Sequence, residues 1–326
     1  MPFNKPIASL SLDLDNQWSY MKTHGDTGWQ SFPSYFQKFV PRMLRFLEER
    51  KLRITVFVVG QDAAMPENSE SLASIAAAGH EIGNHSFAHE PWMHKHHPDR
   101  IDEEVTRAAE SIEAATGRRP VGFRGPGYSS SEQMIEVLER RGYLYDASNL
   151  PTFLGPLARA YYFKTAKLNP EEMEVRKDLF GGFGRGFDTL RAHRFSGREI
   201  IELPVTTMPV FKLPFHISYI IYLSQYSPAL GLLYFRTALE LCYISGISPS
   251  LLLHPPDFLG CDDEIGVDFF PGMRLSSASK LEILSQAIEL YSRMFSVVTL
   301  QEHASQVAQT LGMVSAPARV ARSPLP

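Results

Sequence analysis

The sequence predicts a parallel α/β fold, and two observations lead to it. Strand-like apolar runs alternate with stretches of helical periodicity, which is the order of repeated β–α units. Polar motifs stand directly after several of these runs, and parallel α/β folds build their sites at the carboxyl ends of the strands. This agreement between pattern and chemistry favours an enzyme.

The strands are expected where short apolar or alternating runs end in polar or turn residues. The first such run, ASLSLDLD, alternates strictly and ends in carboxylates. Helices are expected where apolar residues recur at helical spacing and glycines mark the ends. The expected strands are 8–15, 54–60, 80–86, 121–128, 144–148, 200–206, 250–255 and 296–300, and the expected helices are 34–50, 68–79, 98–116 and 130–141.

One region interrupts this order, so an irregular insertion is expected around 153–245. A chain of 326 residues with 44% hydrophobic residues can form one large core. We therefore expect a single domain over 1–312 with the insertion inside it. The remaining residues, 313–326, are expected to be a disordered tail.

Composition excludes several classes of protein. The formal net charge is −4 and no basic stripe is present, which argues against a nucleic-acid partner. The two cysteines, Cys242 and Cys261, are too few for a disulfide framework or a cysteine zinc site. The N-terminal residues lack the pattern of a signal peptide, so cytoplasmic residence is the expectation.

Two histidines and two carboxylates suggest a metal site. His85 and His89 are four residues apart, and Asp13 and Asp15 end the first strand on the same face. Taken singly, the histidines could be solvated loop residues and the carboxylates could cap a turn. A set of two histidines and one carboxylate leaves coordination positions open, and both hydrolytic zinc and non-haem iron sites use it.

The motifs also resemble, in order, those of the polysaccharide deacetylase (NodB-homology, carbohydrate esterase) family. The resemblance is close over 7–150 and looser over 198–300. It implies a distorted (β/α) barrel, often with seven strands, and a metal-dependent hydrolase that removes an N-acyl group, such as acetyl, from a carbohydrate. The segments that carry it are SLDLDNQW, ITVFVVG, GHEIGNHSFAH, GFRGPGYS, YDAS and LLLHPPD.

The resemblance implies a metal centre with a neighbouring base. Asp15, His85 and His89 would bind a divalent metal, with Zn²⁺ as the leading candidate and Co²⁺, Ni²⁺, Mn²⁺ or Fe²⁺ as alternatives. Asp13 would be the catalytic base, and Arg124 would pair with it and set its orientation. The family usually has adjacent carboxylates at this motif, whereas Leu14 separates them here.

The remaining roles concern the leaving group and the substrate. His254 would protonate the leaving amine, and Asp146 is the nearest candidate for a carboxylate that tunes it. A backbone N–H of Gly127 or Tyr128 would stabilise the oxyanion, and Trp18 is expected to contact the substrate. Gly127 is itself a departure from the family, since it separates Pro126 from Tyr128.

An uncharged, aromatic-rich segment covers 213–235. One interpretation is a buried helical insertion, and the other is a surface that contacts a membrane or an acyl chain. A spanning helix is disfavoured, because it would separate the metal motifs from His254. The second interpretation favours a lipid-linked glycan precursor, whereas a soluble or polymeric N-acetyl sugar is the alternative. The oligomeric state is not predicted.

Two other functions compete with the deacetylase. One is a metal-independent hydrolase of small amides, similar to allantoinase-like relatives, and the other is a non-catalytic glycan-binding relic. Both are disfavoured by the complete set of family residues, which comprises Asp13, Asp15, His85, His89, Arg124 and His254.

Overall fold

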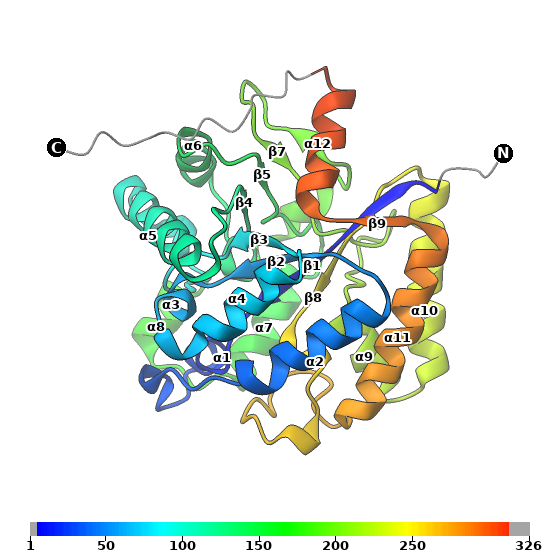
Figure 1. The fold of residues 1–326 in the computed structure, drawn as a ribbon, viewed down its shortest axis with the longest axis horizontal. Coiled ribbons are helices and arrows are strands. Elements are labelled where there is room, and N and C mark those ends of the chain that lie inside the picture. Colours follow the sequence, from blue (N-terminus) through cyan, green and yellow to red (C-terminus); the bar gives the residue numbers. More distant parts are fainter. Residues whose placement is uncertain (1–4, 313–326) are drawn as a thin grey trace.

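The computed structural model describes residues 5–312, which form one sheet surrounded by helices (Figure 1). Within these residues the sheet has nine strands, in the spatial order β6-β7-β5-β4-β3-β2-β1-β8, and β9 pairs with β1. The predicted tail, 313–326, lies outside the described residues. The strands are β1 (Ile7–Leu14), β2 (Thr55–Val58), β3 (Glu81–Asn84), β4 (Gly122–Phe123), β5 (Tyr145–Asp146), β6 (His193–Arg194), β7 (Ile201–Glu202), β8 (Ser250–Leu253) and β9 (Ser296–Val298).

The sheet is built on a series of parallel strands that runs from β7 to β8. This series contains seven strands, as the family resemblance implies for the barrel. Each strand predicted from the sequence is present. β6, which was not predicted, pairs antiparallel with β7.

The barrel closes through the chain that follows β7 rather than through a regular strand pair. The Thr206 N–H donates to the Ser250 carbonyl at 3.0 Å, and the Ser250 N–H donates to the Thr206 Oγ1 at 2.8 Å. These bonds join the two ends of the parallel series. The result is the distorted (β/α) barrel that was expected.

The alternation along β1 separates two environments. Leu10, Leu12 and Leu14 are fully buried in the large core between the sheet and the outer helices. Ser11 and Asp13 point the other way and contact Arg124. Because successive side chains of a strand alternate between faces, the pattern SLSLDL directs its polar residues into the barrel.

Helices cover the outside of the barrel in two groups (Figure 1). α2, α4, α5 and α6 follow one another along one side, and α9, α10 and α11 lie together on another. α2, α4, α5 and α6 match the four predicted helices. The α-helices are α1 (Gln17–His24), α2 (Phe36–Glu49), α3 (Gly60–Ala63), α4 (Ser69–Ala77), α5 (Pro98–Thr116), α6 (Glu132–Arg140), α7 (Gly155–Thr165), α8 (Pro170–Val175), α9 (Ile217–Ser224), α10 (Pro228–Ile244), α11 (Ser277–Met294) and α12 (Leu300–Thr310).

α12 packs against β1 and β7 and closes the barrel at the end opposite the strands' carboxyl ends. Its Leu300 and Ala304 are buried in a cluster with Phe57, Tyr145 and Leu203, which come from β2, β5 and the end of β7. The interior is therefore a packed core and not a pore.

The predicted insertion, 153–245, divides into two parts. Its first part carries α7, α8 and β6 and is held against α1, since the Tyr162 hydroxyl and Arg176 Nη1 both donate to the Thr23 carbonyl, at 2.6 and 2.8 Å. Its second part is regular barrel structure, with β7, α9 and α10 in order. In the described residues no helix has the length and apolar character needed to cross a bilayer.

Candidate metal centre and active site

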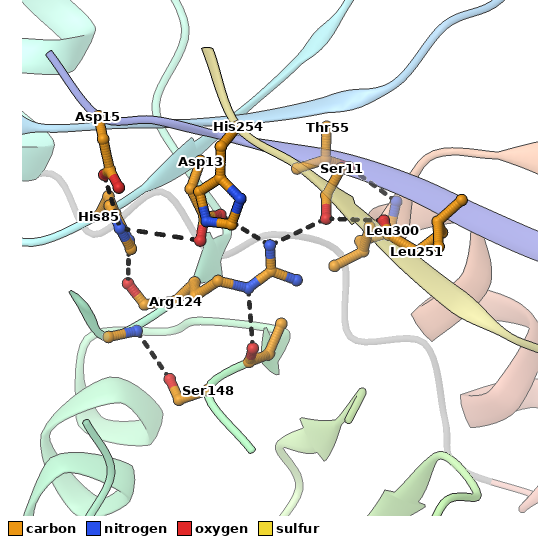
Figure 2. Close-up of polar contacts among 12 residues, drawn as sticks. Ser11, Asp13, Asp15, Thr55, His85, Arg124, Ser148, Leu251, His254 and Leu300 are labelled. Atoms are coloured by element: carbon orange, nitrogen blue, oxygen red, sulfur yellow. Dashed lines mark hydrogen bonds and ion pairs between the residues drawn. The ribbon is translucent and has the colours of Figure 1, made fainter. Parts of the chain in front are cut away.

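The predicted site residues gather at the carboxyl ends of four parallel strands. Asp13 and Asp15 end β1, His85 follows β3, Arg124 follows β4 and His254 follows β8. Figure 2 shows these side chains in one region of the barrel mouth. The strand order explains why residues so far apart in sequence meet.

Asp15, His85 and His89 form a compact, buried set of possible metal ligands. The Asp15 Oδ1 lies 2.9 Å from the His89 Nε2 and 3.3 Å from the His85 Nε2. The Asp15 Oδ1 and His89 Nε2 are nevertheless buried without a properly oriented hydrogen-bond partner among residues 5–312. Atoms that converge in this way fit ligands aimed at one shared cation, and the donor set suits zinc or a similar divalent metal.

The backbone and the neighbouring strand orient the histidines. The His85 Nδ1 donates to the Arg124 carbonyl at 2.6 Å, so Nε2 is the ring nitrogen that faces Asp15. His89 has a φ of 48°, and Ser86 has a φ of 61°. The turn between the two histidines thus uses left-handed conformations, which are costly for non-glycine residues and occur often at functional sites.

The charges of this set depend on one another. Burial raises the pKa of the Asp15 carboxyl, but His89 and His85 outweigh that effect and hold the pKa well below its usual range. Burial lowers the pKa of His85, and Asp13 and Asp15 more than reverse it, so this pKa is raised. A cation would replace the histidine protons as the partner of Asp15.

Asp13 belongs to a separate ion pair with Arg124. The Arg124 Nη1 donates to the Asp13 Oδ1 at 2.7 Å and to the Ser11 Oγ at 2.9 Å. Its Nε donates to the Ala147 carbonyl at 2.9 Å, and the guanidinium lies 4.4 Å from the centre of the Phe57 ring. Since Arg124 is fully buried, this arrangement fixes one Asp13 oxygen in place. The other oxygen, Oδ2, lies 3.9 Å from the His85 Nε2.

His254 is half-buried on the opposite side of β1, since β8 pairs with β1 across from β2. Its Nδ1 lies 3.3 Å from the Ser218 Oγ, and its backbone N–H donates to the Asp257 Oδ2 at 2.8 Å. The rings of His216 and Phe270 have centroids 5.8 and 6.2 Å from that of His254.

Asp146, the predicted partner of His254, lies elsewhere in the barrel. Its Oδ1 accepts a hydrogen bond from the Ser148 Oγ at 2.5 Å, and it is paired with Glu202. Burial raises the pKa of Asp146, and burial together with Asp146 raises the pKa of Glu202 well above its usual value. Asp257 contacts the backbone N–H of His254, and no hydrogen bond between Asp146 and His254 is present among the described residues.

The predicted oxyanion donors form a tight turn beside Pro91. Gly127 and Tyr128 have φ values of 58° and 62°, and a Cβ on Gly127 would approach the Pro91 Cβ to 2.8 Å. The Tyr128 N–H donates to the Gly125 carbonyl at 3.1 Å. Gly127 is therefore the better of the two candidates for an oxyanion donor.

Trp18 lies behind the metal ligands rather than on an open surface. Its indole is almost fully buried, and its Nε1 donates to the Asp62 Oδ1 at 2.9 Å. The ring centroid lies 6.4 Å from that of His89. This placement favours a supporting role for the loop after β1 over direct contact with a substrate.

Three residues around His254 were not singled out from the sequence: His216, Ser218 and Asp257. His216 and Ser218 lie in the apolar 213–235 segment, and its hydrophobic composition gave no indication of a polar site there. Asp257 had a usable signal, because a carboxylate three residues after His254 has the spacing of a capping box.

The sequence of residues 22–145 matches the family model described as polysaccharide deacetylase. This stretch contains His85, His89 and Arg124 but not Asp13, Asp15 or His254. Among curated proteins, the peptidoglycan deacetylase-like protein FGM2 of Gibberella zeae is 34% identical over 128 residues, which are 38% of this chain and 35% of that protein. The peptidoglycan deacetylase of Helicobacter pylori is 31% identical over 110 residues, which are 33% of this chain and 36% of that protein.

The chain thus spans about a third of the length of the curated relatives it matches. The fold, in contrast, has a relative along its whole length. The crystal structure of a candidate polysaccharide deacetylase from Mycobacterium smegmatis covers 100% of this chain and 97% of its own, with a TM-score of 0.59 and 20% identity. That likeness supports the distorted barrel.

Proposed function

Because the chain belongs to the polysaccharide deacetylase family, which its residues 22–145 match, we propose that it is a metal-dependent hydrolase that removes an N-acyl group from a carbohydrate. The observation that carries the proposal is the buried convergence of Asp15, His85 and His89, in which the Asp15 Oδ1 and the His89 Nε2 have no hydrogen-bond partner among the described residues. An acetyl group is the expected acyl group, and Zn²⁺ is the expected metal.

The ligand set defines what the metal contributes. Asp15, His85 and His89 would hold a divalent ion, and such an ion would supply Lewis-acid activation of water and of the acyl carbonyl. Asp13 accepts the proton of the attacking water through its free Oδ2, because Arg124 holds the Oδ1. The position of Asp13 beside His85 puts this base next to the metal ligands.

The acid and the oxyanion donor complete the reaction. His254 donates a proton to the nitrogen of the leaving amine, because an unprotonated amine is a poor leaving group. The Gly127 N–H is our candidate for stabilising the oxyanion. The substrate class is a polysaccharide or glycan, and the names of the curated relatives support peptidoglycan-like N-acetyl sugars. The presence of base, ligands and acid in one barrel mouth favours this function over a metal-independent amidase or a relic.

The proposal is tested by measuring metal content and released acetate together. The Asp15→Ala variant is expected to lose its bound metal and to release no acetate from an N-acetylglucosamine oligosaccharide. Asp99→Ala, which removes a carboxylate that is 94% exposed, is the matched control and should keep both. An Asp15→Ala protein with full activity would show that the reaction needs no metal at this site.

The 213–235 segment supports a narrower proposal about the substrate. α9 and α10 each bury residues in the core, but large apolar residues are exposed on both helices and between them: Tyr222, Tyr226, Leu230 and Leu233. We propose that this surface contacts the lipid of a lipid-linked glycan precursor, at a membrane that the protein reaches from the cytoplasm.

Flotation with phosphatidylglycerol vesicles tests this contact. The wild-type protein is expected to float with the vesicles, and Leu230→Ser/Leu233→Ser is expected to float at least about threefold less, because apolar area drives interfacial binding. Thr237→Ser on the same helix is the control. Wild-type protein that stays at the bottom of the gradient would leave a soluble glycan as the substrate.

A further inference from the structure

Lys280 on α11 is a fully buried lysine with an unusual set of partners. Its Nζ donates to the carbonyls of Pro256 and Leu259, each at 2.7 Å, and contacts the Met273 Sδ at 3.1 Å. An ammonium group is costly to bury unless charges and hydrogen bonds compensate it. The two carbonyls belong to the loop that directly follows His254, so this lysine is tied to the backbone that carries the proposed acid.

Asp257 supplies the opposite charge from within that loop. Its carboxyl is 1% exposed and accepts the His254 N–H. Burial lowers the pKa of Lys280 to about 8, and Asp257 opposes that shift. Burial raises the pKa of Asp257, while His254, Ser218 and Lys280 oppose the rise. Each group thus favours the charged form of the other.

Ser218 links this pair to the imidazole itself. Its side chain is buried at the first turn of α9, and its Oγ lies 3.3 Å from the His254 Nδ1. The same hydroxyl opposes the rise in the pKa of Asp257 that burial causes. With Nδ1 engaged by Ser218, the Nε2 of His254 is the nitrogen left to face a substrate.

We propose that Lys280, Asp257 and Ser218 act together as a buried support that positions His254 as the acid of the reaction. Three elements then meet at the acid: the loop after β8, α9 and α11. The inference rests on the proposed function, because only a reaction with a poor leaving group requires a positioned acid. It assigns a role to α9 and α11, which lie outside the stretch that matches the family.

The leaving group provides a readout that a purely structural role would not move. An amine leaves only with a proton, so hydrolysis of an N-acetyl glycan depends on the acid. A nitrophenolate leaves without one, so hydrolysis of 4-nitrophenyl acetate depends on the metal and the base alone. A misplaced His254 must therefore lower the first activity much more than the second.

Ser218→Ala is the decisive variant, and Ser224→Ala is its matched control. Both serines are buried on α9, but the Ser224 Oγ has no hydrogen-bond partner among the described residues. For Ser218→Ala we expect kcat on an N-acetylglucosamine oligosaccharide to fall by about 10- to 100-fold, which is less than the roughly 10²- to 10⁴-fold contribution of a positioned acid because His254 itself remains. We expect unchanged KM, metal content and 4-nitrophenyl acetate hydrolysis. Ser224→Ala should leave all four unchanged.

Lys280→Met extends the test to the far end of the support, because methionine keeps the length of the side chain without its charge. The same selective loss of glycan hydrolysis is expected. If this variant fails to fold, Ser218→Ala still decides the question. Equal losses on both substrates, or no loss in Ser218→Ala, would overturn the inference and leave the deacetylase function standing. A metal-loaded wild-type protein that hydrolyses neither substrate would overturn the proposed function and the inference with it.

Discussion

Asp13 and Asp15 show how two identical side chains, two residues apart, acquire different roles. Both point into the barrel mouth because residues i and i+2 of a strand share a face. Asp15 faces two imidazoles, whereas Asp13 faces a buried guanidinium. A carboxylate beside histidines can share a cation with them, and a carboxylate held by an arginine at one oxygen keeps the other for a proton. Their neighbours, not their own chemistry, divide the roles.

Asp13→Asn is therefore expected to separate metal binding from turnover. Asparagine keeps the shape of the side chain and can still accept the Arg124 hydrogen bond, but it cannot take up a proton. The variant should retain its metal and lose about 10²- to 10⁴-fold in kcat on an N-acetyl glycan. Metal analysis and acetate release measure the two effects. Loss of metal from this variant would mean that Asp13 is a ligand.

The sequence predicted which residues gather at this site but not every pair within it. The convergence of Asp15, His85 and His89 and the contact of Arg124 with Asp13 agree with the prediction. Asp146, predicted to tune His254, instead accepts a hydrogen bond from Ser148 and is paired with Glu202 on the neighbouring strand β7, whereas His254 follows β8. Strand order decides which carboxylate meets which base, and periodicity carries no information about strand order.

At the scale of elements, α12 covers one end of the barrel and packs against the first strand, β1. Its His303 is 2% exposed, and the Nδ1 of that histidine lies 2.9 Å from the Ser9 Oγ on β1. Burial lowers the pKa of His303 from 6.5 to about 4. The neutral imidazole is thus the form that the folded barrel accommodates.

This shift predicts a specific loss of stability in mild acid. The unfolded chain binds the proton near pH 6.5 and the folded chain only near pH 4, so the contribution of His303 is complete above pH 6.5 and is lost as the pH falls toward 4. At pH 5 the loss is about 2 kcal/mol of unfolding free energy. Urea unfolding of wild type and His303→Asn at pH 7.5 and 5.0 measures it.

His303→Asn can keep the bond to Ser9 without titrating. Its unfolding free energy should therefore fall less than that of wild type between the two pH values, by about 2 kcal/mol. His97→Asn, at a side chain that is 77% exposed, should behave as wild type. Equal pH dependence in wild type and His303→Asn would show that His303 is protonated in the folded barrel.

At the scale of the whole molecule, the parallel α/β order could be predicted because strands and helices differ in hydrophobic period. Side chains on one face recur every two residues in a strand and about every 3.6 residues in a helix. α5 shows this best, since Pro98 and Gly117 mark both of its ends in the sequence and in the structure. The strand β6 and the helices α1, α3, α7, α8, α11 and α12 were not predicted. α7 and α8 are held by contacts to α1, such as those of Tyr162 and Arg176, rather than by their own periodicity, and β6 is held by its pairing with β7. The closure through Thr206 and Ser250 uses a side chain as an acceptor and has no sequence pattern.

The position of β1 between β2 and β8 has a consequence for how such a protein can diversify. The proposed metal ligands and base come from the end of β1 and from the loop after β3, before residue 125, while His254, Ser218 and Lys280 come from later in the chain. Changes in the segment between β5 and β8 therefore leave the proposed ligands and base in place, but they reach the proposed acid through Ser218. The register of Leu12 with Leu253 between β1 and β8 fixes how Asp13 and His254 stand relative to each other.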